Sequence, residues 1–249
     1  MFRLSHFIIL LSLFSSSALA HFSIDKSRLY FDKKNRFQTV TIRNTSEAPL
    51  SYTIKVNHVE MSEEGRITPV ADENNVPQSA KKLLRYSPRR GTILPGGSQI
   101  VRFTIRKPAG LENGEYRSQL RIEGGLVGEA HVLSARLAYN MPIIVRHGKT
   151  EASADLELLG LERNDKGQPM LALLIKREGT RSLFGSFTIT NAKGEVIGQT
   201  KGVSVYEPLN KRKISIELTG EITPRVNVVY EELKEYGGTA KVQKSYSLR

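Results

Sequence analysis

The stretch His131–Arg146, HVLSARLAYNMPIIVR, is the segment on which the interpretation of the whole chain depends. Read in steps of two, it places Leu133, Ala135, Leu137 and Tyr139 on one face. The residues between them are mostly polar, and this alternation predicts a β-strand with one apolar face. The strand is long, because about 5–6 residues is usual in globular proteins.

Pro142 divides this strand into two parts. Proline has no N–H to donate to a β-ladder, so we expect part of the strand to lie at a sheet edge. The apolar run that follows, residues 143–145, is typical of a strand buried on both faces. A long exposed edge invites pairing with another chain. Two interpretations are open: a core strand that ends in an interdomain linker, or an edge strand whose function is to pair with a partner.

Residues 1–20 have the pattern of a secretory signal peptide. Arg3 supplies a positive charge, residues 7–14 an apolar core, and residues 18–20 a small-residue cleavage site. The apolar core, about eight residues, is too short to span a bilayer. We therefore expect an exported protein that starts near His21, without stable membrane insertion.

Composition narrows the class of protein further. The chain of 249 residues has 39% hydrophobic residues, enough for one or two packed domains, and no cysteine. An exported protein without disulfides is typical of the bacterial periplasm. The formal net charge of +12 indicates either solubility or an acidic partner. Export and the lack of a nucleic-acid-binding motif argue against nucleic acid.

Short alternating segments separated by turn residues fill the chain before Arg146. Residues 37–43 and 52–58 are predicted strands, joined by the turn-rich segment Asn44–Pro49. Residues 65–80 are expected to form a polar loop. Strands about ten residues apart, with almost no helical periodicity, predict an antiparallel β-sandwich.

A second set of short alternating segments follows Arg146. Candidate hairpin turns occur at residues 165–167 and 191–194. We therefore expect an all-β protein with two β-sandwich domains, residues 21–146 and residues 147–249, packed at an angle through a short linker.

Motifs for catalysis and metal binding are absent from the sequence. The histidines after the signal peptide, His21, His58, His131 and His147, are not at metal-ligand spacing with one another. We find neither a nucleophile motif of the G-x-S-x-G kind nor a phosphate-binding glycine loop. The sequence therefore predicts neither an enzyme nor a metal site, and no cofactor.

Arginines recur on and around the predicted strands of the N-terminal half: Arg28, Arg85, Arg89, Arg90, Arg117, Arg121 and Arg136. A guanidinium group can bind a carboxylate through two parallel hydrogen bonds. The alternative is that the heads reach into solvent while the stems cover apolar surface.

The N-terminal half resembles the periplasmic pilus-assembly chaperones of the P-pilus type. The resembling segments occur in the expected order and cover most of residues 22–146: FSIDKSRLYFD, TVTIRNTSEAPLSYTIKV, LRYSPRRGTILPGGSQIVRFTI, GEYRSQLRIEG and HVLSARLAYNMPIIVR. The segments YSPRR…LPGGSQIVR and GEYRSQLR are most similar to the archaic and alternative branches. The second half resembles this family only in its β-sandwich character.

This resemblance implies two immunoglobulin-like domains in an L-shaped arrangement. It implies a periplasmic chaperone that binds pilus or fimbrial subunits by donor-strand complementation and delivers them to an outer-membrane usher. By family position, the subunit-binding residues are Leu133, Ala135, Leu137, Tyr139 and Met141. Arg28 falls where the family places an arginine that binds the carboxyl terminus of the subunit.

The chain departs from the family at Pro142, where well-studied members have a lysine that assists this arginine. The candidates for a replacement cation are Arg85, Arg89, Arg117 and Arg136. The residues alone leave the choice among them open.

Two alternatives belong to other function classes. A secreted structural or adhesive pilus component would carry an N-terminal donor extension, and none is evident between Ala20 and the first predicted strand. An exported hydrolase would need a catalytic constellation, which the sequence lacks.

Overall fold

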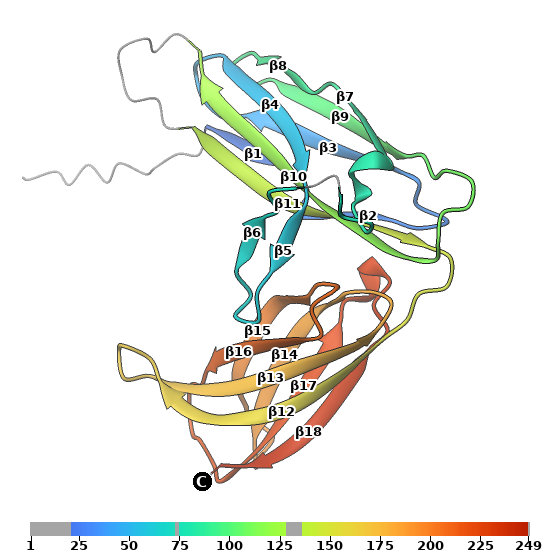
Figure 1. The fold of residues 1–249 in the computed structure, drawn as a ribbon. Helices are drawn as coiled ribbons and strands as arrows, with labels where there is room; N and C mark the ends of the chain where they lie inside the picture. Colours follow the sequence, from blue (N-terminus) through green and yellow to red (C-terminus); the bar gives the residue numbers. More distant parts are fainter. Residues whose placement is uncertain (1–20, 73–74, 128–135, 249) are drawn as a thin grey trace, which may run out of the picture.

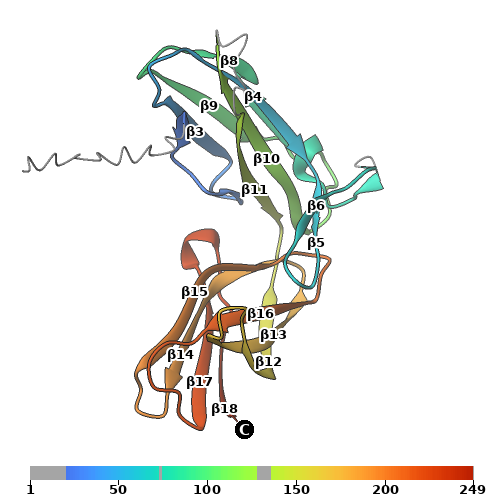
Figure 2. The ribbon, with the colours of Figure 1, turned by 90° about the vertical axis from the view of Figure 1, so that its left-hand side faces the viewer.

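A computed structural model describes residues 21–72, 75–127 and 136–248. Within these ranges the chain forms β-sandwiches stacked end to end and set at an angle to each other (Figure 1; Figure 2). The described part includes two short 3₁₀ turns, η2 (Ala80–Lys82) and η3 (Lys234–Tyr236). No helix in these ranges is long and apolar enough to cross a membrane. The all-β, two-domain expectation is confirmed.

The first sandwich is built from the strands β1 (Phe22–Ile24), β2 (Leu29–Phe31), β3 (Phe37–Asn44), β4 (Leu50–Asn57), β7 (Leu84–Ser87), β8 (Arg90–Ile93), β9 (Ser98–Ile105), β10 (Gly114–Leu126) and β11 (Leu137–His147). One sheet has the order β1-β3-β9-β7 and the facing sheet β2-β11-β10-β4-β8. In β4 the side chains alternate between buried and exposed along most of the strand. This period of two places one face of each sheet in a shared apolar core.

The second sandwich contains the strands β12 (Ala152–Arg163), β13 (Pro169–Gly179), β14 (Leu183–Asn191), β15 (Val196–Val205), β16 (Lys211–Glu217), β17 (Arg225–Glu232) and β18 (Lys241–Ser247). Its sheets have the orders β12-β13-β16 and β15-β14-β17-β18. A separate apolar cluster fills the space between them. The turns predicted at residues 165–167 and 191–194 connect β12 to β13 and β14 to β15.

The first predicted strand is two strands. The sequence FSIDKSRLYF is interpreted as a first strand that contains Arg28, but β1 pairs with β3 in one sheet and β2 pairs with β11 in the other. The chain crosses between the sheets through Asp25–Arg28. Arg28 therefore lies at a switch between sheets and not within a strand.

The predicted polar loop at residues 65–80 is also partly wrong. Residues Ile67–Pro69 form β6, which pairs with β5 (Val59–Met61) in an antiparallel hairpin. This hairpin projects from the first sandwich toward the second (Figure 1).

Strand β11 pairs with β10 along its whole described length, Leu137 to His147. The run after Pro142 is buried on both faces, as expected: Ile143 and Val145 are fully buried and Ile144 is 2% exposed. Leu133 and Ala135, the first two predicted subunit-binding residues, lie outside the described residues.

Candidate functional site

An open sheet edge runs along the first half of β11. Residues 137–142 pair with β10 on one side, and β2 occupies the other side only from Ile143 to Val145. Within the described residues, no strand pairs with the second side of 137–142. Pro142 stands opposite Gln119, at the end of this open edge. The edge position that a proline predicts is confirmed.

The apolar row on β11 faces the core of its own sandwich. Met141 is 1% exposed, and Leu137 and Tyr139 are half-buried against the core cluster. The Tyr139 hydroxyl donates a hydrogen bond to the Phe22 carbonyl (3.0 Å), and the two rings meet edge to face at 5.0 Å. Leu137 and Tyr139 are more exposed than Met141. Apolar residues of a partner placed beside Leu137 would extend the core of the first sandwich.

Arg28 stands where the open edge ends. Strands β2 and β11 are parallel with Leu29 opposite Ile143, so Arg28 lies next to the level of Pro142. Any strand paired with residues 137–141 along the open edge would have one of its ends next to β2 and Arg28. The register therefore joins the edge and this arginine in one site.

Aromatic side chains of the second domain surround the Arg28 guanidinium. Its central carbon lies 3.6 Å from the ring centre of Phe184, 5.5 Å from that of Tyr236 and 5.9 Å from that of Tyr206. All three distances are within the range of a cation–π contact. Arg28 also donates a hydrogen bond to the Tyr206 hydroxyl at 3.3 Å. We call Phe184, Tyr206 and Tyr236 the aromatic cage.

Arg28 is a buried cation without a counterion in the described chain. It is 8% exposed, and none of the described carboxylates lies within 4.0 Å of it. A buried charge is costly unless it is paired, and the π faces of the cage offset only part of that cost. A carboxylate from outside the chain would complete the pairing.

Arg117, one of the four candidate second cations, shares the cage with Arg28. Its guanidinium lies 4.5 Å from the ring centre of Tyr206, and the residue is 3% exposed. One terminal nitrogen donates to the Val59 carbonyl at 2.8 Å, but the buried Nε has no partner among the described atoms. Burial lowers the pKa of Arg117, and the nearby Arg28 lowers it further.

The other three candidates lie elsewhere. Arg85 and Arg89 are exposed at β7, the edge strand of the opposite sheet, and Arg89 covers the ring of Tyr86. Arg136 is exposed just before β11. Of the four arginines, the structure brings only Arg117 against the same ring as Arg28.

A basic cleft of about 800 Å³ opens between the domains, beyond the far end of β11. Lys33, Lys34, Arg36 and Lys107 line it, and none of them forms an ion pair with a described residue. The Lys107 amine donates to the Arg146 carbonyl at 3.0 Å. Burial lowers the pKa of Lys107, and the neighbouring charge of Arg36 lowers it further.

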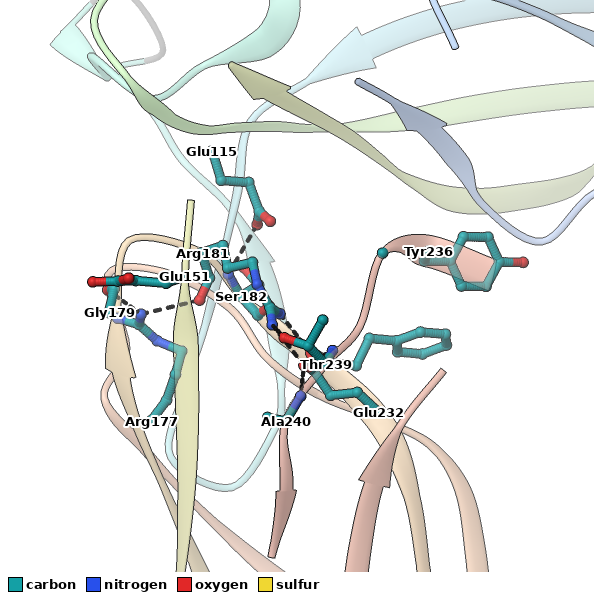
Figure 3. A network of polar contacts seen from close by, with 12 residues as sticks. Glu115, Glu151, Arg177, Gly179, Arg181, Ser182, Glu232, Tyr236, Thr239 and Ala240 are labelled. Atoms are coloured by element: carbon teal, nitrogen blue, oxygen red, sulfur yellow. Dashed lines mark hydrogen bonds and ion pairs between the residues drawn. The ribbon is translucent and has the colours of Figure 1, made fainter. Parts of the chain in front are cut away.

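Two buried ion pairs lie at or near the junction between the domains, and Figure 3 shows the one between Arg181 and Glu232. Arg146 binds Glu115 (3.0 Å), and the other oxygen of Glu115 accepts the Ser182 backbone N–H from the second domain at 3.2 Å. Deeper in the second domain, Arg181 and Glu232 form two hydrogen bonds of 2.7 and 2.8 Å. This pair positions the start of β14, and therefore Phe184, because Glu232 also accepts the Phe184 N–H.

Sequence reasoning proposed Arg28 and the strand as site residues, and it gave no sign of the aromatic cage. Phe184, Tyr206 and Tyr236 come from three separate segments of the second domain. No spacing between them signals a common site, since only the packing of the domains brings them to Arg28.

Among the described residues, no group of three or more His, Asp or Glu side chains could hold a metal ion.

Comparisons with known proteins concern the fold. No protein-family model and no curated protein sequence matches the chain. Solved structures do match. The structure of the YadV chaperone aligns with this chain at 11% sequence identity and a TM-score of 0.52, and the alignment covers 92% of this chain and 100% of the YadV chain. A structure of the Salmonella enterica SafA pilin in complex with the SafB chaperone also aligns, at 12% sequence identity and a TM-score of 0.52. This alignment covers 94% of this chain and 99% of the matched chain.

The chain has the fold of the fimbrial chaperones. The class 5 fimbriae chaperone CfaA agrees, covering 92% of this chain and 100% of its own at 14% identity and a TM-score of 0.50. The resemblance noted from the sequence is confirmed by these structures. At such identities the likeness concerns the fold, and residue roles follow from the geometry of this chain.

Proposed function

We propose that this protein is a periplasmic chaperone that binds pilus or fimbrial subunits along the open edge of β11 and delivers them to an outer-membrane usher. The observation that carries the proposal is the continuity between the open edge at residues 137–142 and the unpaired, caged Arg28 at its end. The chaperone fold and the predicted signal peptide at residues 1–20 support it.

The open edge supplies the affinity for an incomplete subunit. A strand added to this edge receives main-chain hydrogen bonds from residues 137–141, and side chains of alternate residues fill apolar pockets in the partner. In this proposal Leu137 and Tyr139, with Leu133 and Ala135 before them, form the donated row. Met141 anchors that row in the chaperone's own core.

Arg28 sets the direction of the bound strand. The open edge approaches Arg28 in the direction in which β11 itself runs. A partner strand parallel to β11 therefore ends at Arg28 with its carboxyl terminus, where the two charges pair. An antiparallel strand would present an amine to the buried cation, which is unfavourable. Arg117, on the same tyrosine ring, is the second cation in place of the lysine absent at Pro142.

We expect Arg28→Ala to weaken subunit binding by about ten- to a hundredfold, since a hydrogen bond between charged groups contributes roughly 1.5–3 kcal/mol. Arg28→Lys is expected to recover only part of the loss, because the planar fork is absent. The measurement is the dissociation constant of a subunit with a free carboxyl terminus and of the same subunit with an amidated terminus. Arg85→Ala, at an exposed arginine far from the cage, is the control.

The two subunit forms decide the role of Arg28. For the unmutated protein the free-acid form is expected to bind more tightly, and Arg28→Ala is expected to reduce that difference strongly, with Arg117 accounting for what remains. If Arg28→Ala preserves the full difference between free acid and amide, Arg28 is not the carboxylate anchor.

A further inference from the structure

The β5–β6 hairpin connects the two domains at a point far from the covalent linker. The linker, residues 148–151, lies on one side of the junction, and the hairpin descends on the other (Figure 1). Two bodies joined at a single linker can rotate about it. A second contact on the opposite side resists that rotation most effectively, because it acts at the greatest distance from the linker.

The tip of the hairpin docks on β16 through its backbone. The Glu63 carbonyl accepts a hydrogen bond from the Lys213 N–H at 2.7 Å. In the sheet order β12-β13-β16, β16 is an edge strand, so this N–H points away from its own sheet. The hairpin therefore satisfies a donor at an edge of the second domain.

The tip and β16 are complementary in charge. The tip carries Glu63 and Glu64, and β16 begins with three consecutive cations, Lys211, Arg212 and Lys213. Glu63 forms an ion pair with Lys211 at 3.2 Å. The side chains of this pair are only half-buried. The pair therefore orients the hairpin tip on β16 but adds little to the free energy of docking.

Gly65 lies directly against Arg212 of β16. It has a φ of 82°, and it closes the turn by donating its N–H to the Ser62 carbonyl at 2.9 Å. A Cβ at this position would lie 2.3 Å from a terminal nitrogen of Arg212. That guanidinium is fixed by a hydrogen bond to the Ser204 carbonyl at 2.7 Å. The position therefore requires glycine both for the turn and for the approach to the second domain.

The hairpin depends on this docking for its own order. Each of its strands has three residues, and all three residues of β6 are exposed. An isolated two-stranded hairpin is marginally stable in water. Its contacts with the second domain therefore stabilise both the hairpin itself and the arrangement of the two domains.

We propose that the β5–β6 hairpin is an interdomain brace that fixes the angle between the two sandwiches. The brace also holds the aromatic cage over Arg28, because the cage belongs to one domain and Arg28 to the other. This consequence for subunit binding rests on the proposed function, whereas the brace itself does not.

Spin-label distance measurements on the partner-free protein test the brace. The chain has no cysteine, so Lys55→Cys in β4 and Lys201→Cys in β15 provide two unique label sites, one in each domain. The perturbing variant replaces residues 61–67 by Asn-Gly, a two-residue hairpin loop that keeps Glu60 opposite Thr68 and removes the tip. We expect one narrow distance distribution for the labelled parent and a clearly broader one for the shortened hairpin.

Gly65→Ala and Gly96→Ala form a matched pair. Both glycines have positive φ, so alanine strains both turns, but a Cβ on Gly96 meets nothing within 4 Å. Gly65→Ala is expected to broaden the distribution, and Gly96→Ala to leave it unchanged. A distribution that is broad in the parent, or that stays narrow without the tip, overturns the brace. Neither result bears on the role of Arg28, which is tested separately by comparing the binding of free-acid and amidated subunits.

Discussion

Leu137→Asp is expected to abolish recovery of a bound subunit. In the proposed complex the subunit covers the part of this side chain that the chaperone's own core leaves exposed, and an unpaired charge buried there costs about 3–5 kcal/mol. That corresponds to at least a hundredfold loss of affinity. Co-purification of a co-expressed subunit with the tagged protein measures the effect.

The same substitution at an exposed leucine controls for the added charge. Leu94 is 70% exposed in the turn between β8 and β9, and Leu94→Asp is expected to retain the subunit. Because Leu137 is half-buried against its own core, thermal unfolding of each free variant accompanies the assay, and Leu137→Ala provides a milder change. Normal subunit recovery by a folded Leu137→Asp protein would contradict pairing at this edge.

Glu232→Ala is expected to destabilise the second domain by about 3–5 kcal/mol, because it leaves Arg181 charged and unpaired in the interior. The two side chains are 2% and 1% exposed and only 2.7 Å apart. Glu221→Ala is the matched control: its ion pair with Lys193 is 2.6 Å long, but both side chains are more than half exposed. Such a pair contributes about 0–1 kcal/mol. Denaturant unfolding measures the loss of stability in both variants. Equal losses would contradict the claim that the buried ion pair stabilises the domain more than the exposed one.

The same pair predicts a dependence on pH. Burial alone would raise the pKa of Glu232, but the hydrogen bonds from Arg181, Ala240 and Thr239 outweigh it and lower the pKa. The unfolded state then binds the proton more readily than the folded one. The stabilisation is therefore complete above the ordinary glutamate pKa of about 4.3 and is lost as the pH falls through the lower folded value. Glu232→Gln removes this component of the acid unfolding curve.

Local patterns in the sequence predict the strands because alternation depends on each strand's own residues. The β4 segment and the apolar run after Pro142 are examples, since both face a core that any sandwich of these strands would have. The division of the segment Phe22–Phe31 into β1 and β2 was missed, because it depends on the pairing of the two halves with β3 and β11 in different sheets.

Features that depend on contacts between domains were not predictable from the sequence. Strand β6 reads as part of the polar loop at residues 65–80, because it is short and the surface on which its hairpin docks lies about 150 residues away on β16. The aromatic cage combines three separate segments with an arginine from the other domain. Arg117 was one candidate among four arginines until the packing placed it on Tyr206.

Amide hydrogen exchange along β11 tests the central claim most directly. In the free protein, the N–H groups of residues 137–141 that point away from β10 have no strand partner among the described residues, so they are expected to exchange rapidly. When a fimbrial subunit binds, these amides are expected to become strongly protected, together with the residues around Arg28. Unchanged exchange at residues 137–141 in a complex that is otherwise intact would contradict capture of the subunit by this edge.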